Sequence, residues 1–172
     1  MLIYHPVYDV NHCLYRFLLI LENSTHEDFD WDAIKLLDFY LLFPHMLKAI
    51  KPMPASLRAF SKVIKQIPDA YEALPNAKRV LFDLGNLQNT AMMNLMAKEL
   101  VDTELFHRKV IKRSEKELPE KLKGGVKENP VVSEEWFRLI VNELPLAPFG
   151  GQSGLKKRSG LLEFRYDVEV SK

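Results

Sequence analysis

The chain has 172 residues, a net charge of +1 and an apolar fraction of 47%. This composition indicates a globular protein of one domain, or of one domain with a small appendage, and excludes a mainly disordered chain. The near-neutral charge argues against a protein that binds nucleic acid or membranes over its whole surface.

Cys13 is the single cysteine, so no intramolecular disulfide can form. No apolar run approaches the roughly 18 residues of a membrane span, and the N-terminus lacks signal-peptide features. We therefore expect a cytoplasmic protein.

The first predicted helix follows Asp9, a favourable N-cap residue. Its apolar residues recur at helical spacing and form one stripe: Val10, Cys13, Leu14, Phe17, Leu18 and Leu21. Tyr15 and Leu19 are apolar residues that lie off this stripe. Such additional residues indicate a second packing partner, either within this fold or in another chain. Tyr15 and Leu19 are therefore candidate partner-binding residues.

A second helix is predicted within residues 27–48 and should be the central element of the fold. Residues 36–43 are apolar at every position except Asp38, which is typical of a helix covered on more than one side. Thr25 and Asp28 resemble a capping box at its start. Because of Pro44, the helix should end at about Phe43.

Asp38 is the most unusual carboxylate of the chain, because it lies within this apolar run. A buried carboxylate needs a hydrogen-bonding or charged partner. Arg16 and Arg79 are the candidate partners. We interpret Asp38 as a polar link in the core and not as a catalytic acid.

A third helix is predicted at residues 55–66, and two further helices at residues 77–84 and 87–100, with Gly85 ending the first of these two. Gln88 is predicted on the exposed side of the last helix. Two helices joined by a glycine-containing turn have the outline of a helix-turn-helix. A sixth helix is predicted at residues 134–143.

Two segments favour β-structure. Residues 103–112 are interpreted as a strand, with a helical extension as the alternative, and residues 162–170 alternate strictly between apolar and polar side chains. The terminal strand needs a partner. It could pair with residues 103–112 as the hairpin of a winged helix, or add to a sheet in another protein. Leu162, Phe164 and Tyr166 are therefore candidate partner-binding residues.

The predicted fold class is mostly α (α+β): a helical domain with a helix-turn-helix or winged-helix-like core and a short β hairpin or terminal strand. Residues 1–130 should form the winged-helix-like domain. Residues 131–172 should contribute a helix, a loop and a strand that pack on this domain or on a partner.

Catalytic chemistry is not predicted. The five histidines do not form the HxxxH or HExxH spacings that bind metals. Cys13 lies on the apolar stripe and should be a buried small hydrophobic residue. We therefore expect no catalytic residue, no metal ligand and no cofactor, and the protein should not be an enzyme.

Positive charge is concentrated in residues 105–127, which carry eight basic and three acidic groups. In a winged helix this run would lie against the DNA backbone. A second group of cations follows a glycine-rich loop that lacks the GxxxxGK[ST] phosphate-binding pattern. The candidate residues for nucleic-acid backbone contact are Arg108, Lys109, Lys112, Arg113, Lys156, Lys157 and Arg158.

Three stretches carry a family resemblance: YHPVYDVNHCLYRFLLIL, LLDFYLLFPHML and LQNTAMMNLMAKELV. Together they resemble the small middle components of bacterial ABC-three-component systems, a group that includes the Lamassu-type anti-phage and anti-plasmid defence operons. The resemblance extends from the N-terminus to about residue 105 and leaves the part from Val131 onward outside it.

The resemblance implies a winged-helix-like, non-catalytic adaptor. Its partners would be an SMC-like ABC ATPase and an effector, most often a nuclease, with DNA reached through the complex and no membrane involved. The alternative function is a stand-alone winged-helix transcription regulator that binds an operator.

Overall fold

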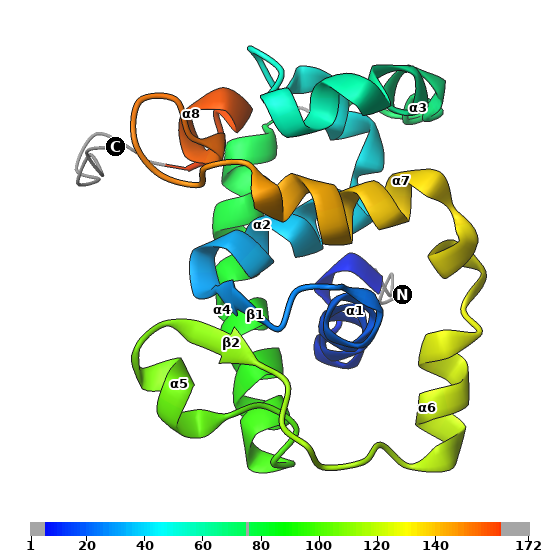
Figure 1. The fold of residues 1–172 in the computed structure, drawn as a ribbon, viewed down its shortest axis with the longest axis vertical. Coiled ribbons are helices and arrows are strands. Elements are labelled where there is room, and N and C mark those ends of the chain that lie inside the picture. Colours follow the sequence, from blue (N-terminus) through cyan, green and yellow to red (C-terminus); the bar gives the residue numbers. More distant parts are fainter. Residues whose placement is uncertain (1–5, 75, 163–172) are drawn as a thin grey trace, which may run out of the picture.

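The computed structural model describes residues 6–74 and 76–162 (Figure 1). Most of this part is helical, as predicted. The α-helices are α1 (Val10–Asn23), α2 (Trp31–Leu42), α3 (Ser61–Gln66), α4 (Ala77–Ala97), α5 (Thr103–His107), α6 (Glu120–Lys127), α7 (Glu135–Arg138) and α8 (Leu155–Ser159). Two short strands, β1 (Asp28–Asp30) and β2 (Val110–Lys112), form one antiparallel sheet. Short 3₁₀ helices lie before and between these elements.

Helix α1 lies in the middle of the fold, where Figure 1 shows it end-on, and it contacts α2, α4 and α6. Asp9 caps it as predicted, because Oδ1 of Asp9 accepts hydrogen bonds from the backbone N–H groups of Asn11 and His12 at 2.8 and 3.0 Å. Phe17 and Leu18, on the predicted stripe, have no solvent exposure. Helices α1 and α2 together form the centre of the core.

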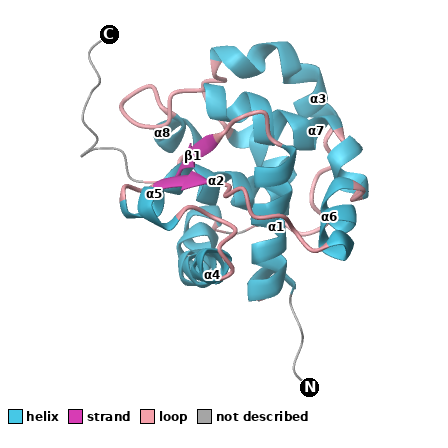
Figure 2. Cartoon of the chain, turned by 60° about the horizontal axis from the view of Figure 1, so that its bottom comes forward, coloured by secondary structure: helices cyan, strands magenta, loops and turns pink. Residues whose placement is uncertain are grey.

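The second predicted helix begins later than expected. Residues Asp28–Asp30 form β1, and Asp30 caps α2 by accepting hydrogen bonds from the N–H groups of Asp32 and Ala33 at 2.9 and 3.1 Å. The predicted capping box at Thr25 is therefore wrong. The reason is long-range pairing, because β1 aligns with β2, more than 80 residues later in the chain, at Phe29 opposite Ile111 (Figure 2). The predicted end of the helix at Phe43 is confirmed.

Helix α4 runs without interruption through Gly85, so the predicted helix-turn-helix is wrong. A glycine inside a helix costs about 1 kcal/mol relative to alanine. That cost is smaller than the free energy gained by burying one continuous apolar face of the helix, which includes Leu81, Leu84 and Leu95. Gln88, predicted to be exposed, lies on the same face and has no solvent exposure.

The segment 103–112 combines both predicted alternatives. Its first half is α5 and its last three residues are β2. Lys109, with φ of 63°, turns the chain between them. Within the described part the strand paired with β2 is β1, which precedes α2. The expected hairpin with the terminal strand depends on residues 163–170, which lie outside the described residues.

Two predicted helices are α-helical only in part. Residues Ala55–Phe60 form a 3₁₀ helix before α3 begins. The helix predicted at 134–143 consists of α7 followed by a π-helix, Leu139–Glu143. The wider π turn receives hydrogen bonds from outside the helix, since Oγ of Ser24 donates to the backbone oxygen of Val141 at 2.8 Å.

The described residues on both sides of position 130 share one core. Phe137 and Ile140, from the later part, are fully buried in the same cluster as Phe17 and Phe39. The segment that contains α8 is also hydrogen-bonded to the earlier part of the chain, because the N–H of Lys51 donates to the backbone oxygen of Arg158 at 3.0 Å. The division of the chain at residue 130 stays a prediction.

Gly154, which precedes α8, is a position where alanine should not fit. A Cβ there would overlap the backbone oxygens of Phe149 and Gly150. These oxygens cannot move freely, because that of Phe149 accepts a hydrogen bond from the N–H of Lys156 at 3.0 Å. We expect Gly154→Ala to lower the free energy of unfolding by about 1–3 kcal/mol, measured by urea denaturation. An unchanged midpoint would contradict this packing.

Candidate functional site

The core contains one buried polar network, built by α1, α2 and α4 around Asp38. The carboxylate of Asp38 has no solvent exposure, and Arg16 donates to it from Nε at 2.6 Å and from Nη2 at 3.2 Å. Such bidentate pairs fix geometry as well as charge. Nε2 of Gln88 donates to the same carboxylate at 2.9 Å. The predicted pairing with Arg16 is confirmed, whereas Arg79 pairs with Asp83 on its own helix at 3.0 Å.

Cys13 belongs to this network and is not suited to nucleophilic chemistry. Its side chain is fully buried, as predicted, and its Sγ lies 3.9 Å from Oδ2 of Asp38. Burial, followed by the charge of Asp38, raises the pKa of the Cys13 thiol far above its ordinary value. The reactive thiolate therefore does not form near neutral pH.

Two of the four cations in the first predicted group, Lys112 and Arg113, are engaged within the chain. Arg113 forms an ion pair with Glu22 and donates to the backbone oxygens of Leu100 and Lys116 at 3.0 and 2.7 Å. Its guanidinium therefore holds the loop after β2 in place. Lys112 also has a carboxylate partner, the side chain of Glu27, at 3.4 Å.

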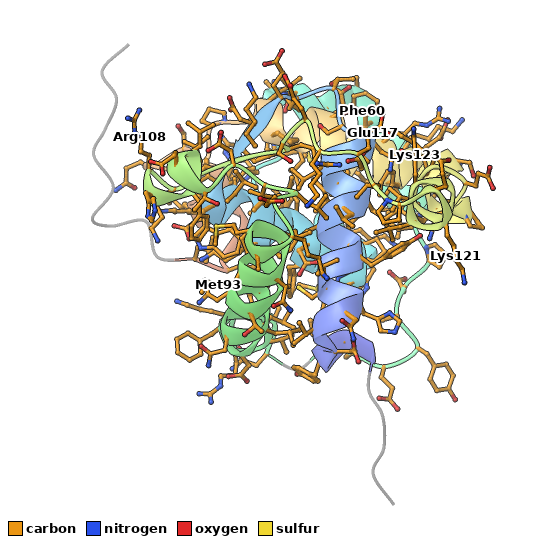
Figure 3. All side chains as sticks on the ribbon, turned by 90° about the horizontal axis from the view of Figure 1, so that it is seen from below. Phe60, Met93, Arg108, Glu117, Lys121 and Lys123 are labelled. Carbon is orange, nitrogen blue, oxygen red and sulfur yellow. The ribbon has the colours of Figure 1, made fainter. Side chains whose placement is uncertain are left out.

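Arg108 and Lys109 are different, since no carboxylate pairs with either within residues 6–74 and 76–162. Lys109 Nζ lies 5.7 Å from the ring centroid of Phe106. Figure 3 shows Arg108 at the outer edge of the molecule. These two side chains are the accessible part of the predicted basic run.

The second predicted group lies on α8, in a different part of the surface from α5 (Figure 1). Arg158 donates to the backbone oxygen of Pro52 at 2.7 Å and so secures α8 to the body of the protein. Lys157 donates to Gln152 at 3.1 Å, and Lys156 Nζ lies 5.3 Å from the ring centroid of Phe149. The fold does not combine the two basic groups into one surface.

The predicted partner-binding residues of α1 are covered by α6. Leu19 is 5% exposed. The hydroxyl of Tyr15 donates to the backbone oxygen of Gly125 at 2.7 Å and accepts from Nδ2 of Asn129 at 3.2 Å. The second packing partner of α1 is therefore within this fold. Phe164 and Tyr166 lie outside the described residues, while Leu162 is half-buried beside α4.

Helix α4 presents an exposed face that the sequence analysis missed. Its residues follow one helical stripe: Phe82, Asn86, Asn89 and Met93. We call these four residues the α4 face. Phe82 and Met93 are 76% and 60% exposed, and residues 84–97 carry no charge. Depletion of charge with exposed aromatic and methionine side chains is typical of the centre of protein–protein interfaces.

A cavity of about 290 Å³ lies beside the α4 face. Phe82, Asn86 and Asn89 line it together with Lys35, Leu161 and Leu162. Gln88 also lines it, and Oε1 of Gln88 is a buried acceptor without a hydrogen-bond partner among the described residues. The α4 face is thus hollowed at one end, which favours an inserted side chain of a partner protein over a flat contact.

The described residues define a mostly helical protein with an exposed, uncharged helix face. Within them no group of three or more His, Cys, Asp or Glu side chains could hold a metal ion. Among the helices of the described part, none combines the length and the apolar character that crossing a membrane requires.

The sequence matches the family model of the ABC-three component (ABC-3C) system Middle Component 5 over residues 2–167. Because the match spans nearly the whole chain, the protein belongs to this family. The resemblance to middle components is thereby confirmed. The expectation that it stops near residue 105 is wrong, since the family pattern continues through the C-terminal third. No curated protein and no solved structure matches the chain.

Proposed function

We propose that the protein is a non-catalytic adaptor subunit that bridges an SMC-like ABC ATPase and an effector nuclease in a bacterial anti-phage or anti-plasmid defence complex of the Lamassu type, acting in the cytoplasm. Membership of the middle-component family supports an adaptor within a multi-component system. The observation that carries the proposal is the α4 face, a row of exposed uncharged side chains that Arg79 borders at one end, 5.7 Å from the ring centroid of Phe82. An exposed helix surface of this kind is suited to contact another protein.

Two further contacts belong to this proposal. Arg108 and Lys109 would touch the phosphate backbone of DNA held by the complex, since they lack carboxylate partners within the described ranges. Leu162, Phe164 and Tyr166 would add to a partner surface as the alternating terminal segment. The alternative, a stand-alone winged-helix transcription regulator, has less support, because residues 77–97 form one helix where a helix-turn-helix was predicted.

The test is co-expression with the neighbouring genes, followed by tagged purification and native mass spectrometry. We expect recovery of an ATPase and an effector with the tagged protein. The double variant Phe82→Glu/Met93→Glu should weaken this association at least about ten-fold, because two carboxylates would be buried in an uncharged contact.

Tyr71→Glu provides the control, because Tyr71 is a fully accessible aromatic residue that belongs neither to the α4 face nor to the lining of its cavity. This variant should retain the partners. A tagged protein that remains alone beside its co-expressed neighbours would overturn the adaptor proposal. Equal retention in both variants would overturn the role of the α4 face.

A further inference from the structure

Helices α3 and α7 lie next to each other in the upper part of Figure 1. Two adjoining cavities, of about 390 and 170 Å³, form a groove between these segments and share Val63 and Glu135 as lining residues. We call this the α3–α7 groove. It is separate from the α4 face, since Figure 3 shows Phe60, which lines the groove, on a different side of the molecule from Met93.

The base of the α3–α7 groove is apolar. Phe60, Val63 and Trp136 are half-buried there, and Ile67 and Leu139 close it from below with 4% and 1% exposure. Each cavity has one aromatic ring, that of Phe60 in the larger and that of Trp136 in the smaller. Such partly open apolar pockets are typical anchoring sites for the apolar side chains of a partner.

The side of the groove formed by α7 is acidic. The lining residues include the carboxylates of Glu134, Glu135 and Glu143 and one cation, Arg138. No cation of the described part of the chain forms an ion pair with any of the three carboxylates. The exposed cations of α3, Lys62 and Lys65, are not among the lining residues. The lining therefore carries unpaired negative charge that a basic partner would complement.

The acidic side is also held in place before any partner binds. It includes the π-helix, a feature often found at functional sites. Ser24 donates to the backbone oxygen of Val141 at 2.8 Å, and Nε2 of His26 lies 2.8 Å from the backbone oxygen of Asn142. The side chain of Asn142, which lines the larger cavity, accepts from the N–H of Thr25 at 2.8 Å. A preformed groove lowers the cost of ordering on binding.

We propose that the α3–α7 groove binds a basic amphipathic helix of a partner protein, with its apolar side chains in the two cavities and its Lys or Arg side chains against Glu134, Glu135 and Glu143. From residue 60 to residue 67 the groove extends about 10 Å, or two helical turns, which matches anchors spaced i, i+3 or i+4, and i+7. The proposal builds on the adaptor function, because a bridging subunit needs a second surface besides the α4 face.

The test uses the full-length protein and a synthetic helical peptide of about 18 residues, with leucine at i, i+3, i+4 and i+7 and lysine elsewhere. We expect binding in the micromolar range, measured by fluorescence anisotropy of the labelled peptide. In NMR spectra the indole N–H signal of Trp136 should shift, while that of Trp31, which is 4% exposed, should not. The same peptide with glutamate in place of lysine should not bind.

The triple variant Glu134→Gln/Glu135→Gln/Glu143→Gln should weaken binding at least about ten-fold. Its matched control is Glu115→Gln/Glu117→Gln/Glu120→Gln, which removes the same charge from exposed carboxylates near α6 and should leave binding unchanged. Equal losses in the two variants, or a shift of Trp31 instead of Trp136, would overturn the groove. If the peptide does not bind while the ATPase and effector still co-purify with the protein, the groove proposal is refuted and the adaptor function stands. If the peptide binds but neither partner co-purifies, the adaptor function is refuted and the groove proposal stands.

Discussion

Replacing Arg16 with methionine should lower the free energy of unfolding by about 3–5 kcal/mol, because the substitution leaves the carboxylate of Asp38 buried without its cation. Asp38 has no solvent exposure and Arg16 is 11% exposed, so water cannot replace the lost partner. Methionine retains most of the apolar stem of Arg16, which restricts the effect to the charge and its hydrogen bonds. The measurement is urea denaturation monitored by circular dichroism.

Arg79→Met is the matched control for this prediction. Arg79 also pairs with an aspartate, Asp83, but the two side chains are 68% and 40% exposed. Exposed ion pairs contribute at most about 1 kcal/mol, so the control should change stability little. The double variant Arg16→Met/Asp38→Leu should be more stable than Arg16→Met alone, because it removes the orphaned charge. Equal losses from Arg16→Met and Arg79→Met would show that Asp38 is not buried as described.

The sequence was informative where one residue constrains its own surroundings. Asp38 interrupts an apolar run, and a carboxylate in such a run must be paired, so a partner such as Arg16 could be predicted. The same holds for Asp9, whose short acceptor side chain before an amphipathic stripe indicated a helix start. For Asp9 this local requirement was sufficient, whereas for Asp38 it left Arg16 and Arg79 as alternatives between which the structure decides.

Features that depend on distant parts of the chain could not be predicted in this way. Strand β1 has three residues and exists because β2 pairs with it, a partner that periodicity in residues 27–48 cannot indicate. The π-helix at Leu139–Glu143 likewise depends on hydrogen bonds from Ser24 and His26. Short segments of this kind take their conformation from tertiary contacts and not from local preference.

The α4 face was missed for a related reason. Gly85 is a common helix-ending residue, so the sequence predicts two helices that meet there and places Phe82 and Met93 on different helices. The signal that could have revealed it is the absence of charge from residues 84–97, combined with the exposed side of a single helix. The α3–α7 groove needed the structure, because its residues come from segments about 70 positions apart.

Gly85→Pro should lower the free energy of unfolding by about 3 kcal/mol or more, because proline removes a backbone donor inside α4 and its ring collides with the carbonyl of residue 81. The loss should be large here, since α4 packs along α1 and its continuity aligns Leu81 and Leu84 with Leu95 in the core. Chemical denaturation measures the change.

Gly85→Ala is the control that separates a continuous helix from a turn. A Cβ on Gly85 would meet nothing within 4 Å. Alanine in the middle of a helix should therefore raise the free energy of unfolding by about 0.5–1 kcal/mol. If Gly85 instead ended a helix in the left-handed conformation, alanine would destabilise the protein and the sign would reverse. A destabilising effect of Gly85→Ala would support the helix-turn-helix and would divide the α4 face between two helices. A stabilising effect of Gly85→Ala, together with the loss of stability in Gly85→Pro, requires the single helix on which the α4 face depends.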